Sequence, residues 1–259
     1  MTMPTPSDFV ANCSMLYADV PALQRPAAAT ADGYRKLEFW WPFEDSVPRA
    51  TEVNTFIDAV SESQATVVAM NFTLGDAESG GRGIVSHPNR AAEFGEHLDV
   101  LVDIVARLGI RRCNAPVGVY LSQYDNEQQL DTAVANLRAA SDRLHPLGAI
   151  PMVEPLSGVD NYPVVTAAQA AQLISRIDDA VGRRGAVGLL ADLYHFAANG
   201  EDIDSVLRTH CDRIVHVQVA DFPGRHEPGT GRLEIDRFLG LLRELGYRGE
   251  IALEYIPSR

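Results

Sequence analysis

The sequence lacks paired cysteines, long apolar runs and a leader segment, and each absence excludes a class of protein. Its three cysteines, Cys13, Cys113 and Cys211, lie far apart and form no CxxC pair. An odd, dispersed set is typical of reduced thiols in the cytoplasm rather than of a disulfide framework. No stretch approaches the roughly 20 apolar residues that a membrane-spanning helix needs. Residues 1–16 contain neither a basic segment nor a cleavable apolar segment, so we expect a cytoplasmic protein without a secretory signal.

Positive charge is also scarce. The chain has 22 lysines and arginines against 35 aspartates and glutamates, which gives a formal net charge of −13, and no basic run interrupts it. Nucleic acid and anionic membranes attract basic surfaces, so neither is expected as a partner. The acidity on its own indicates no more than solubility. A small molecule remains as the expected ligand.

The 259 residues contain no low-complexity linker and no break in composition, which predicts one domain over residues 1–259. Short apolar runs alternate with stretches of helical period such as 91–108, 127–147 and 233–245. The runs are apolar on both faces, as in a parallel sheet covered by helices. A doubly wound open sheet would alternate in the same way, but the count and the length favour a (β/α)₈ TIM barrel. The eight strand candidates are 9–13, 36–40, 65–72, 110–117, 149–154, 186–192, 213–220 and 250–255.

The last expected helix of this barrel is absent from the sequence, which ends at Arg259, directly after the eighth strand candidate. A barrel of eight strands with seven long helices would expose apolar surface on its first and last strands. We therefore expect a partner subunit in a homo-oligomer, or residues outside this sequence, to cover that groove.

Acidic residues recur at the ends of the late strands. Barrel enzymes carry their reactive groups at the carboxyl ends of the strands. Here the fifth, sixth and eighth strands end in Glu154, Asp192 and Glu254, each after an apolar run, and the seventh reaches Gln218. Three buried carboxylates that converge on one opening would repel each other unless a cation lay among them. Hard oxygen donors with one amide favour Mg²⁺ or Mn²⁺.

Each of these residues alone has a plainer interpretation. Glu154 before a proline could cap the next helix, and Asp192 is a residue type that often caps a helix N-terminus. A single histidine such as His195 is more often a satisfied core or surface residue than a ligand. The prediction therefore depends on the recurrence of suitable side chains at four consecutive strand ends.

Eight segments between residues 10 and 256 form a set of motifs: ANCSMLY (11–17), LEFWWPF (37–43), GDAESGGRGI (75–84), VEP (153–155), DLYH (192–195), HVQVAD (216–221), EPGTG (227–231) and LEY (253–255). This set resembles the motifs of the hydroxypyruvate isomerase family, a branch of the xylose isomerase-like barrels that also holds ketose 3-epimerases. The resemblance implies that Glu154, Asp192, Gln218 and Glu254 ligate a divalent metal. It also implies that Glu154 and Glu254 are the proton donor and acceptor. The related epimerases usually have histidine at the position of Gln218, so glutamine here favours the isomerase branch.

The sequence departs from the family pattern at three places. Met70 stands where family members often carry histidine, and the loop 117–127 replaces a basic or polar one. The final helix is missing. These departures leave the expected metal ligands in place and affect the substrate contacts.

The resemblance implies a metal-dependent aldose–ketose isomerase of a short hydroxy-keto acid, with hydroxypyruvate converted to tartronate semialdehyde through an enediolate. His195 is expected to bind a substrate oxygen, and Arg82 and Arg225, on loops after the third and seventh strands, are candidates for holding the carboxylate. Both could equally be solvated loop arginines. Asn71, after the third strand, and Glu227, beside Arg225, complete the expected substrate contacts.

Other functions remain open at this point. A ketose 3-epimerase or a longer-chain sugar-acid isomerase could use the same metal site, and the length of the pocket would separate them. A dehydratase or nuclease of this barrel class is a further alternative, but only seven histidines occur, and few lie at strand ends. A non-enzymatic sugar-binding barrel would have no metal-dependent turnover.

Overall fold

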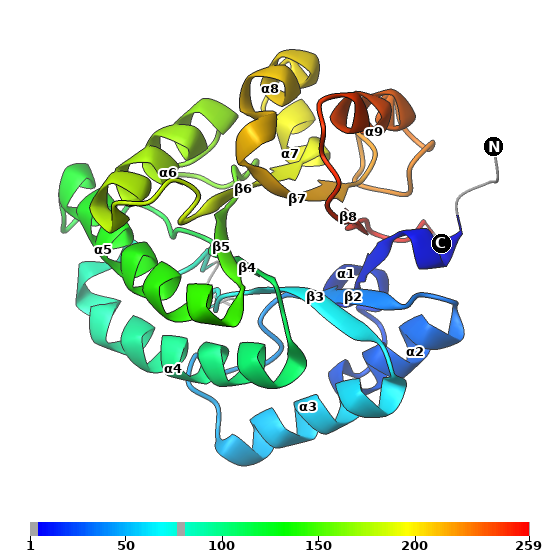
Figure 1. Ribbon diagram of the computed structural model, residues 1–259, viewed down its shortest axis with the longest axis horizontal. Helices are drawn as coiled ribbons and strands as arrows, with labels where there is room; N and C mark the ends of the chain where they lie inside the picture. The colour runs from blue at the N-terminus through cyan, green and yellow to red at the C-terminus, as the bar shows by residue number, and fades with distance from the viewer. Residues whose placement is uncertain (1–4, 77–80, 259) are drawn as a thin grey trace.

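The computed structural model describes residues 5–76 and 81–258, which form a closed barrel of eight parallel strands (Figure 1). Neighbours in the sequence are neighbours in the barrel, and β1 pairs with β8 to close it. The predicted (β/α)₈ barrel is therefore confirmed. The strands are β1 (Val10–Asn12), β2 (Lys36–Phe39), β3 (Thr66–Asn71), β4 (Arg112–Asn114), β5 (Ile150–Val153), β6 (Gly188–Asp192), β7 (Ile214–Val219) and β8 (Ile251–Leu253).

The helices form a ring outside the strands (Figure 1). The predicted helix 91–108 is observed with those bounds, and Gly109 ends it in the left-handed conformation, at φ 69°. Within the described residues, no helix has the combination of length and hydropathy that crossing a bilayer requires. The helices are α1 (Cys13–Leu16), α2 (Arg25–Ala31), α3 (Ala50–Ser63), α4 (Ala91–Leu108), α5 (Asn126–Leu144), α6 (Ala167–Val181), α7 (Leu193–Ala198), α8 (Ile203–His210) and α9 (Ile235–Glu244).

Two predicted elements end earlier than expected beside a proline. The strand expected over 110–117 is observed over Arg112–Asn114, and its carboxyl end lies just before Pro116, which has no N–H to continue the ladder. The helix expected over 127–147 ends at Leu144 and continues as a 3₁₀ turn that contains Pro146. Neither change moves the strand ends that carry the candidate site.

The interior of the fold is mainly apolar. Leu37, Leu101, Ile104 and Leu189 are fully buried, and burial of each such side chain stabilises the fold by about 1.5–3 kcal/mol. Many of the buried polar side chains lie instead on or just after the carboxyl ends of the strands. They are Asn12, Glu38, Asn114, Glu154, Asp192, Gln218 and Glu254.

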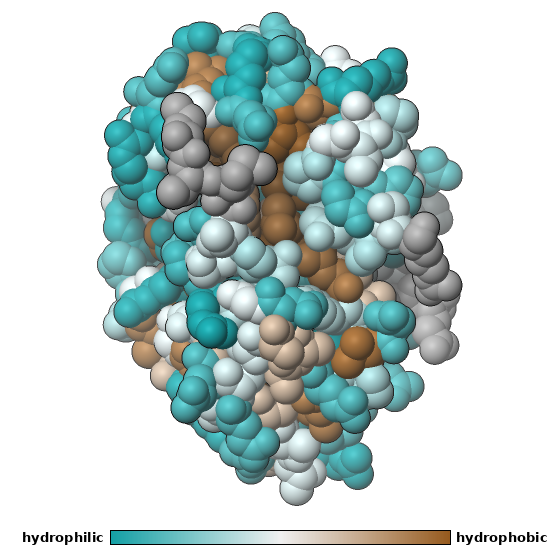
Figure 2. Space-filling model, turned by 90° about the vertical axis from the view of Figure 1, so that its right-hand side faces the viewer, coloured by the Kyte–Doolittle hydropathy of each residue, from teal (hydrophilic) through white to brown (hydrophobic). Residues whose placement is uncertain are grey.

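A groove of about 580 Å³ lies between α9 and strands β1 and β8, and its lining includes Phe9, Leu239 and Leu253. No helix follows β8 within residues 254–258. Figure 2 looks onto this side of the molecule and shows hydrophobic residues gathered in a furrow. The apolar groove expected beside the last strand is therefore present in the described chain. That a second subunit covers it stays a prediction.

Candidate active site

The register of the barrel brings the predicted ligands to one opening. Asp192 and Gln218 are paired residues of β6 and β7. Glu254 follows β8 and donates its N–H to the carbonyl of Val219 at 3.1 Å. Glu154 follows β5. These four side chains are each no more than 5% exposed, so the carboxyl end of the barrel holds a buried acidic cluster.

Asp192 caps a helix, as its residue type suggested, and also takes part in the cluster. Its Oδ1 accepts the N–H of Tyr194 at 2.8 Å, which caps the N-terminus of α7. Its Oδ2 accepts Nη2 of Arg225 at 3.2 Å and lies 3.5 Å from Nε2 of His195. The helix cap therefore fixes one oxygen and leaves the other free for the cluster.

Arg225 enters the cluster from the loop after β7. Its Nη2 is bonded to both Asp192 and Glu254, so the guanidinium lies between two of the carboxylates. Burial alone would lower the pKa of Arg225, but the carboxylates of Glu254, Asp192 and Glu154 raise it above the usual value. Arg225 is therefore a permanent positive charge among the acids.

Asp221 organises the loop that carries Arg225. Its Oδ1 accepts the N–H of Phe222 at 2.8 Å and of Leu233 at 2.9 Å, and its Oδ2 accepts the N–H of Gly229 at 2.8 Å. Gly229 has φ 92°, a left-handed conformation that glycine adopts without strain. At Gly231 a Cβ atom would lie 2.4 Å from Oδ1 of Asp221, so only glycine fits there.

The two glutamates directly follow β5 and β8, and the pKa values of both are raised. Glu154 accepts Nδ2 of Asn114 at 2.7 Å, and burial, with Glu254 and Asp192 nearby, raises its pKa well above the usual range. Burial raises the pKa of Glu254 to about 7; Arg225 opposes this shift, and Asp192 adds to it. Carboxyl groups with raised pKa values in a buried site are suited to proton transfer.

His195 is held in one orientation by the loop after β5. The N–H of Ser157 donates to its Nδ1 at 3.0 Å, and Nη1 of Arg225 lies 3.2 Å from its Nε2. Nε2 is 3.5 Å from Asp192 and 3.7 Å from Glu154. Burial lowers the pKa of His195 to about 4, with Arg225 adding to the effect and Asp192 opposing it. The ring is therefore neutral.

The donor atoms of the cluster fit a divalent cation. Possible ligand atoms of Glu154, Asp192 and His195 lie within 4.8 Å of one another. The Oε1 atom of Gln218 is buried and has no hydrogen-bond partner among the described residues. An unpaired buried acceptor costs about 1–3 kcal/mol, a cost that a bound cation would offset. Carboxylate and amide oxygens are the donors that Mg²⁺ and Mn²⁺ prefer.

A cavity of about 330 Å³ opens above this cluster. Four residues predicted to bind substrate line it, namely His195, Asn71, Arg82 and Arg225. Trp40 lines it as well. Glu227 is elsewhere: its carboxylate accepts the N–H and Oγ of Ser258, at 2.9 and 2.8 Å. The structure does not bring Glu227 to the cavity, because its side chain turns toward the end of the chain.

Three further side chains complete the site, namely Asn12, Glu38 and His216. No role was predicted for them from the sequence. Asn12 donates to both Glu38 and Glu254, at 2.9 Å each, and Nε2 of His216 lies 2.6 Å from Glu38. One signal for His216 was available, because residues two apart on a strand share a face, and Gln218 is two residues on. No such local signal links Asn12 to residues of distant strands.

Comparison with known proteins agrees with this fold. The family model described as "Xylose isomerase-like TIM barrel" matches residues 26–259. A Streptomyces coelicolor protein assigned provisionally as a hydroxypyruvate isomerase is 36% identical over 96% of this chain and 91% of its own length. The 2-oxo-tetronate isomerase of Cupriavidus necator is 31% identical over 96% and 92%. A crystal structure of a Brucella melitensis protein described as a family 2 AP endonuclease superposes with a TM-score of 0.86, at 29% identity, over 99% of this chain and 95% of its own.

Proposed function

The chain belongs to the xylose isomerase-like TIM barrel family, and from that membership and the contacts of its site we propose that it is a divalent-metal-dependent isomerase of short sugar acids, with hydroxypyruvate as substrate and tartronate semialdehyde as product. The observation that carries the proposal is the pair of buried glutamates, Glu154 and Glu254, beside an amide oxygen of Gln218 that has no partner in the described chain. The names of the relatives support the reaction class.

Glu154, Asp192, Gln218 and Glu254 would hold Mg²⁺ or Mn²⁺, and His195 lies close enough to join them. When bound, the cation supplies Lewis-acid stabilisation of negative charge that develops on the substrate oxygens. The same charge would keep both glutamates ionised, which is the state that a base requires. The cytoplasmic, homo-oligomeric form expected from the sequence belongs to this proposal.

The proton transfer joins adjacent carbons of the substrate. One glutamate removes a proton from the CH₂OH carbon, which leaves a cis-enediolate, and a glutamate then returns a proton to the former carbonyl carbon. The hydroxyl proton passes to the former carbonyl oxygen, so the atoms balance. Glu254 is held in place for this by Asn12 and Trp40, both at 2.9 Å, and Glu154 by Asn114 at 2.7 Å.

The remaining cavity residues would bind the acid. Arg82 and Arg225 line the cavity and can pair with a carboxylate, which would distinguish a sugar acid from a neutral sugar. Nε2 of His195 faces the same space and can form a hydrogen bond with a substrate oxygen. Asn71 adds an amide at the end of β3. This set favours an anionic substrate in a protein that carries a net charge of −13.

A four-carbon sugar acid is the second candidate substrate, because the Cupriavidus necator relative is named for one. Its chemistry would use the same glutamates and the same cation. A nuclease is not favoured: within residues 5–76 and 81–258, His195 is the one histidine that lines the cavity.

The direct test is an assay of metal-stripped protein with hydroxypyruvate and with 2-oxo-tetronate, before and after Mg²⁺ or Mn²⁺ is restored. We expect turnover that depends on the cation, with hydroxypyruvate giving the higher kcat/KM. Faster turnover of 2-oxo-tetronate would move the substrate assignment to the four-carbon acid. Absence of turnover with either acid, in protein that binds the cation, would contradict the proposal.

A further inference from the structure

We propose that Glu38 is a positioning residue that sets the orientation of the Gln218 side-chain amide and thereby the metal affinity of the site. The inference deepens the proposed function and rests on its metal site. Glu38 lies on β2, is 2% exposed, and carries no role in the chemistry described above.

The hydrogen bonds of Glu38 reach three other side chains. Oε1 accepts Nε2 of Gln218 at 2.7 Å and Nδ2 of Asn12 at 2.9 Å, and Oε2 lies 2.6 Å from Nε2 of His216. Oε1 of Glu38 therefore acts as an acceptor for the N–H groups of two side-chain amides, while His216 contacts the other carboxylate oxygen.

The backbone independently fixes the amide of Asn12. Its Oδ1 accepts the N–H groups of Ser14 and Met15, each at 3.1 Å, where Asn12 caps α1. A backbone N–H can only donate, so the oxygen of Asn12 must face α1. Its NH₂ group must then face Glu38 and Glu254, and Asn12 cannot serve as an acceptor for either carboxylate.

The consequence falls on Gln218. A side-chain amide has one donating end and one accepting end. Because Glu38 accepts, the NH₂ end of Gln218 must face it, and Oε1 becomes the end that no other described residue engages. With the amide reversed, two oxygens would stand 2.7 Å apart, and the NH₂ group would be presented to the cation. Glu38 thus makes glutamine an oxygen ligand at this position.

His216 holds Glu38 in turn. It lies two residues before Gln218 on β7 and is 1% exposed, so the two side chains project from the same face of one strand. Residues that orient a metal ligand typically change metal affinity 10- to 100-fold when they are replaced. The effect expected at Glu38 is of that size.

The experiment is a calorimetric titration of metal-free protein with Mn²⁺. Glu38→Gln should weaken Mn²⁺ binding about 10- to 100-fold, because an amide at position 38 no longer dictates the orientation of Gln218. Adding Gln218→Glu to that variant should restore binding to the wild-type value or tighter, since the exchange returns one donor and one acceptor to the pair. The matched control is Glu250→Gln, at the amino end of β8 and paired with Lys36 at 2.8 Å, which should leave the affinity unchanged.

Far-UV circular dichroism and the melting temperature of each metal-free variant separate a folding defect from a ligand defect. If Glu38→Gln alone does not fold, the double variant still decides, because it retains one carboxylate and one amide. Wild-type affinity in Glu38→Gln would overturn the inference, as would a folded double variant that binds Mn²⁺ 100-fold more weakly than wild type. Because the readout is binding, wild-type protein that binds Mn²⁺ without isomerising a sugar acid would contradict the proposed function and leave this inference standing.

Discussion

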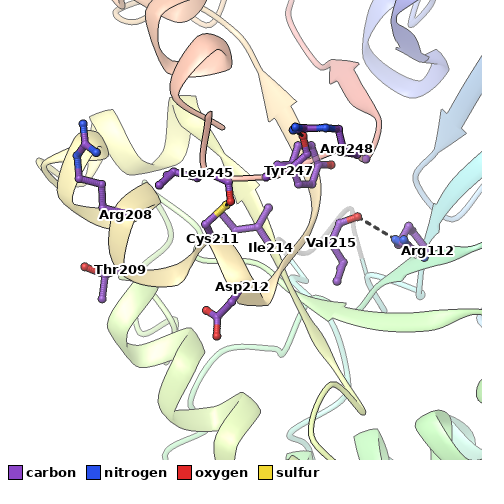
Figure 3. Close-up of a pocket in the computed structure, with 12 residues that line it drawn as sticks. Arg112, Arg208, Thr209, Cys211, Asp212, Ile214, Val215, Leu245, Tyr247 and Arg248 are labelled. Atoms are coloured by element: carbon purple, nitrogen blue, oxygen red, sulfur yellow. Dashed lines mark hydrogen bonds between the residues drawn. The ribbon is translucent and has the colours of Figure 1, made fainter. Parts of the chain in front are cut away.

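The two ends of the barrel both contain a cavity, and they differ in how their polar groups are satisfied. The amino end has the larger one, about 570 Å³, lined by residues such as Arg112, Tyr247 and Arg248 (Figure 3). Two of its polar side chains are paired with backbone carbonyls: Arg112 with Val215 at 2.8 Å, and the hydroxyl of Tyr247 with Glu250 at 2.7 Å. Both of these groups are satisfied without a ligand.

The carboxyl end has a smaller cavity, about 330 Å³, and its charged groups pair with one another. Among the described residues, Oε1 of Gln218 and Oδ1 of Asn114 are buried there without a partner. Buried polar atoms are nearly always hydrogen-bonded, so unpaired ones indicate a missing ligand more reliably than cavity size does. We therefore expect the function at the carboxyl end, and changes at both ends can test this expectation.

The largest effect is expected for Asp192→Ala. Loss of this carboxylate should abolish both metal binding and activity, because the remaining ligands hold a hard cation poorly. Asp212→Ala, at the amino-end pocket, is the matched control and should retain both. The metal content of the dialysed proteins and the isomerase rate measure the difference. Full metal occupancy in Asp192→Ala would contradict the ligand assignment.

Next in size are Glu154→Gln and Glu254→Gln. Each amide can still coordinate through its oxygen, so the fold and part of the metal binding should persist. Loss of an acid–base group should lower kcat by roughly two orders of magnitude or more. Steady-state kinetics at saturating metal give the comparison. A variant that turns over near the wild-type rate would identify that glutamate as a ligand without a proton-transfer role.

A smaller effect is expected when the arginines of the cavity are replaced. Arg225→Met and Arg82→Met should each remove a charge-assisted pair with the substrate carboxylate and lower kcat/KM for hydroxypyruvate roughly 10- to 150-fold, mainly through KM. Arg208→Met, at the amino end, should change nothing. Neutral ketoses should be affected much less. If both cavity variants handle hydroxypyruvate normally, the acid-specific interpretation fails.

The smallest effect on turnover is expected at His97, a buried histidine of α4. Its Nδ1 lies 2.9 Å from the carbonyl of Ser46, and its Nε2 accepts the N–H of Thr73 at 3.1 Å, so it joins the loops after β2 and β3. Burial lowers the pKa of His97 to about 4, and the bond to Ser46 opposes this. Because the unfolded chain binds the proton near pH 6.5, the stability that neutral His97 contributes is lost as the pH falls from 6.5 toward 4, by up to about 3 kcal/mol.

Urea unfolding of wild type and of His97→Gln at pH 7 and at pH 4.5 tests this. The difference in free energy of unfolding between wild type and variant should be smaller at pH 4.5. The glutamates with raised pKa values do not affect this difference, because both proteins contain them. His145→Gln, at an exposed position, should show no such convergence. An equal difference at the two pH values would mean that His97 does not titrate as proposed.

The barrel and the strand-end positions of its candidate ligands could be predicted because both are encoded locally. Each strand is a short apolar run, and Glu154, Asp192 and Glu254 each follow one directly, so the position of the acid at a strand end is visible without coordinates. Glu227 marks the limit of this approach. It is two residues from Arg225, yet its carboxylate binds Ser258, because a turning loop sends neighbouring side chains in different directions.

The number of strands, the carboxyl-end position of the acidic residues and the oxygen-rich donor set can be predicted from the amino-acid order alone. The side chains that hold those donors in place can be identified only from the folded barrel. Glu38 and Gln218 are 180 residues apart in the sequence, and Asn12 and Glu254 are 242 residues apart. Each pair meets only because the barrel closes in one register. Local period fixes which face a side chain occupies, whereas the partner across the barrel depends on strands that are far apart in the sequence.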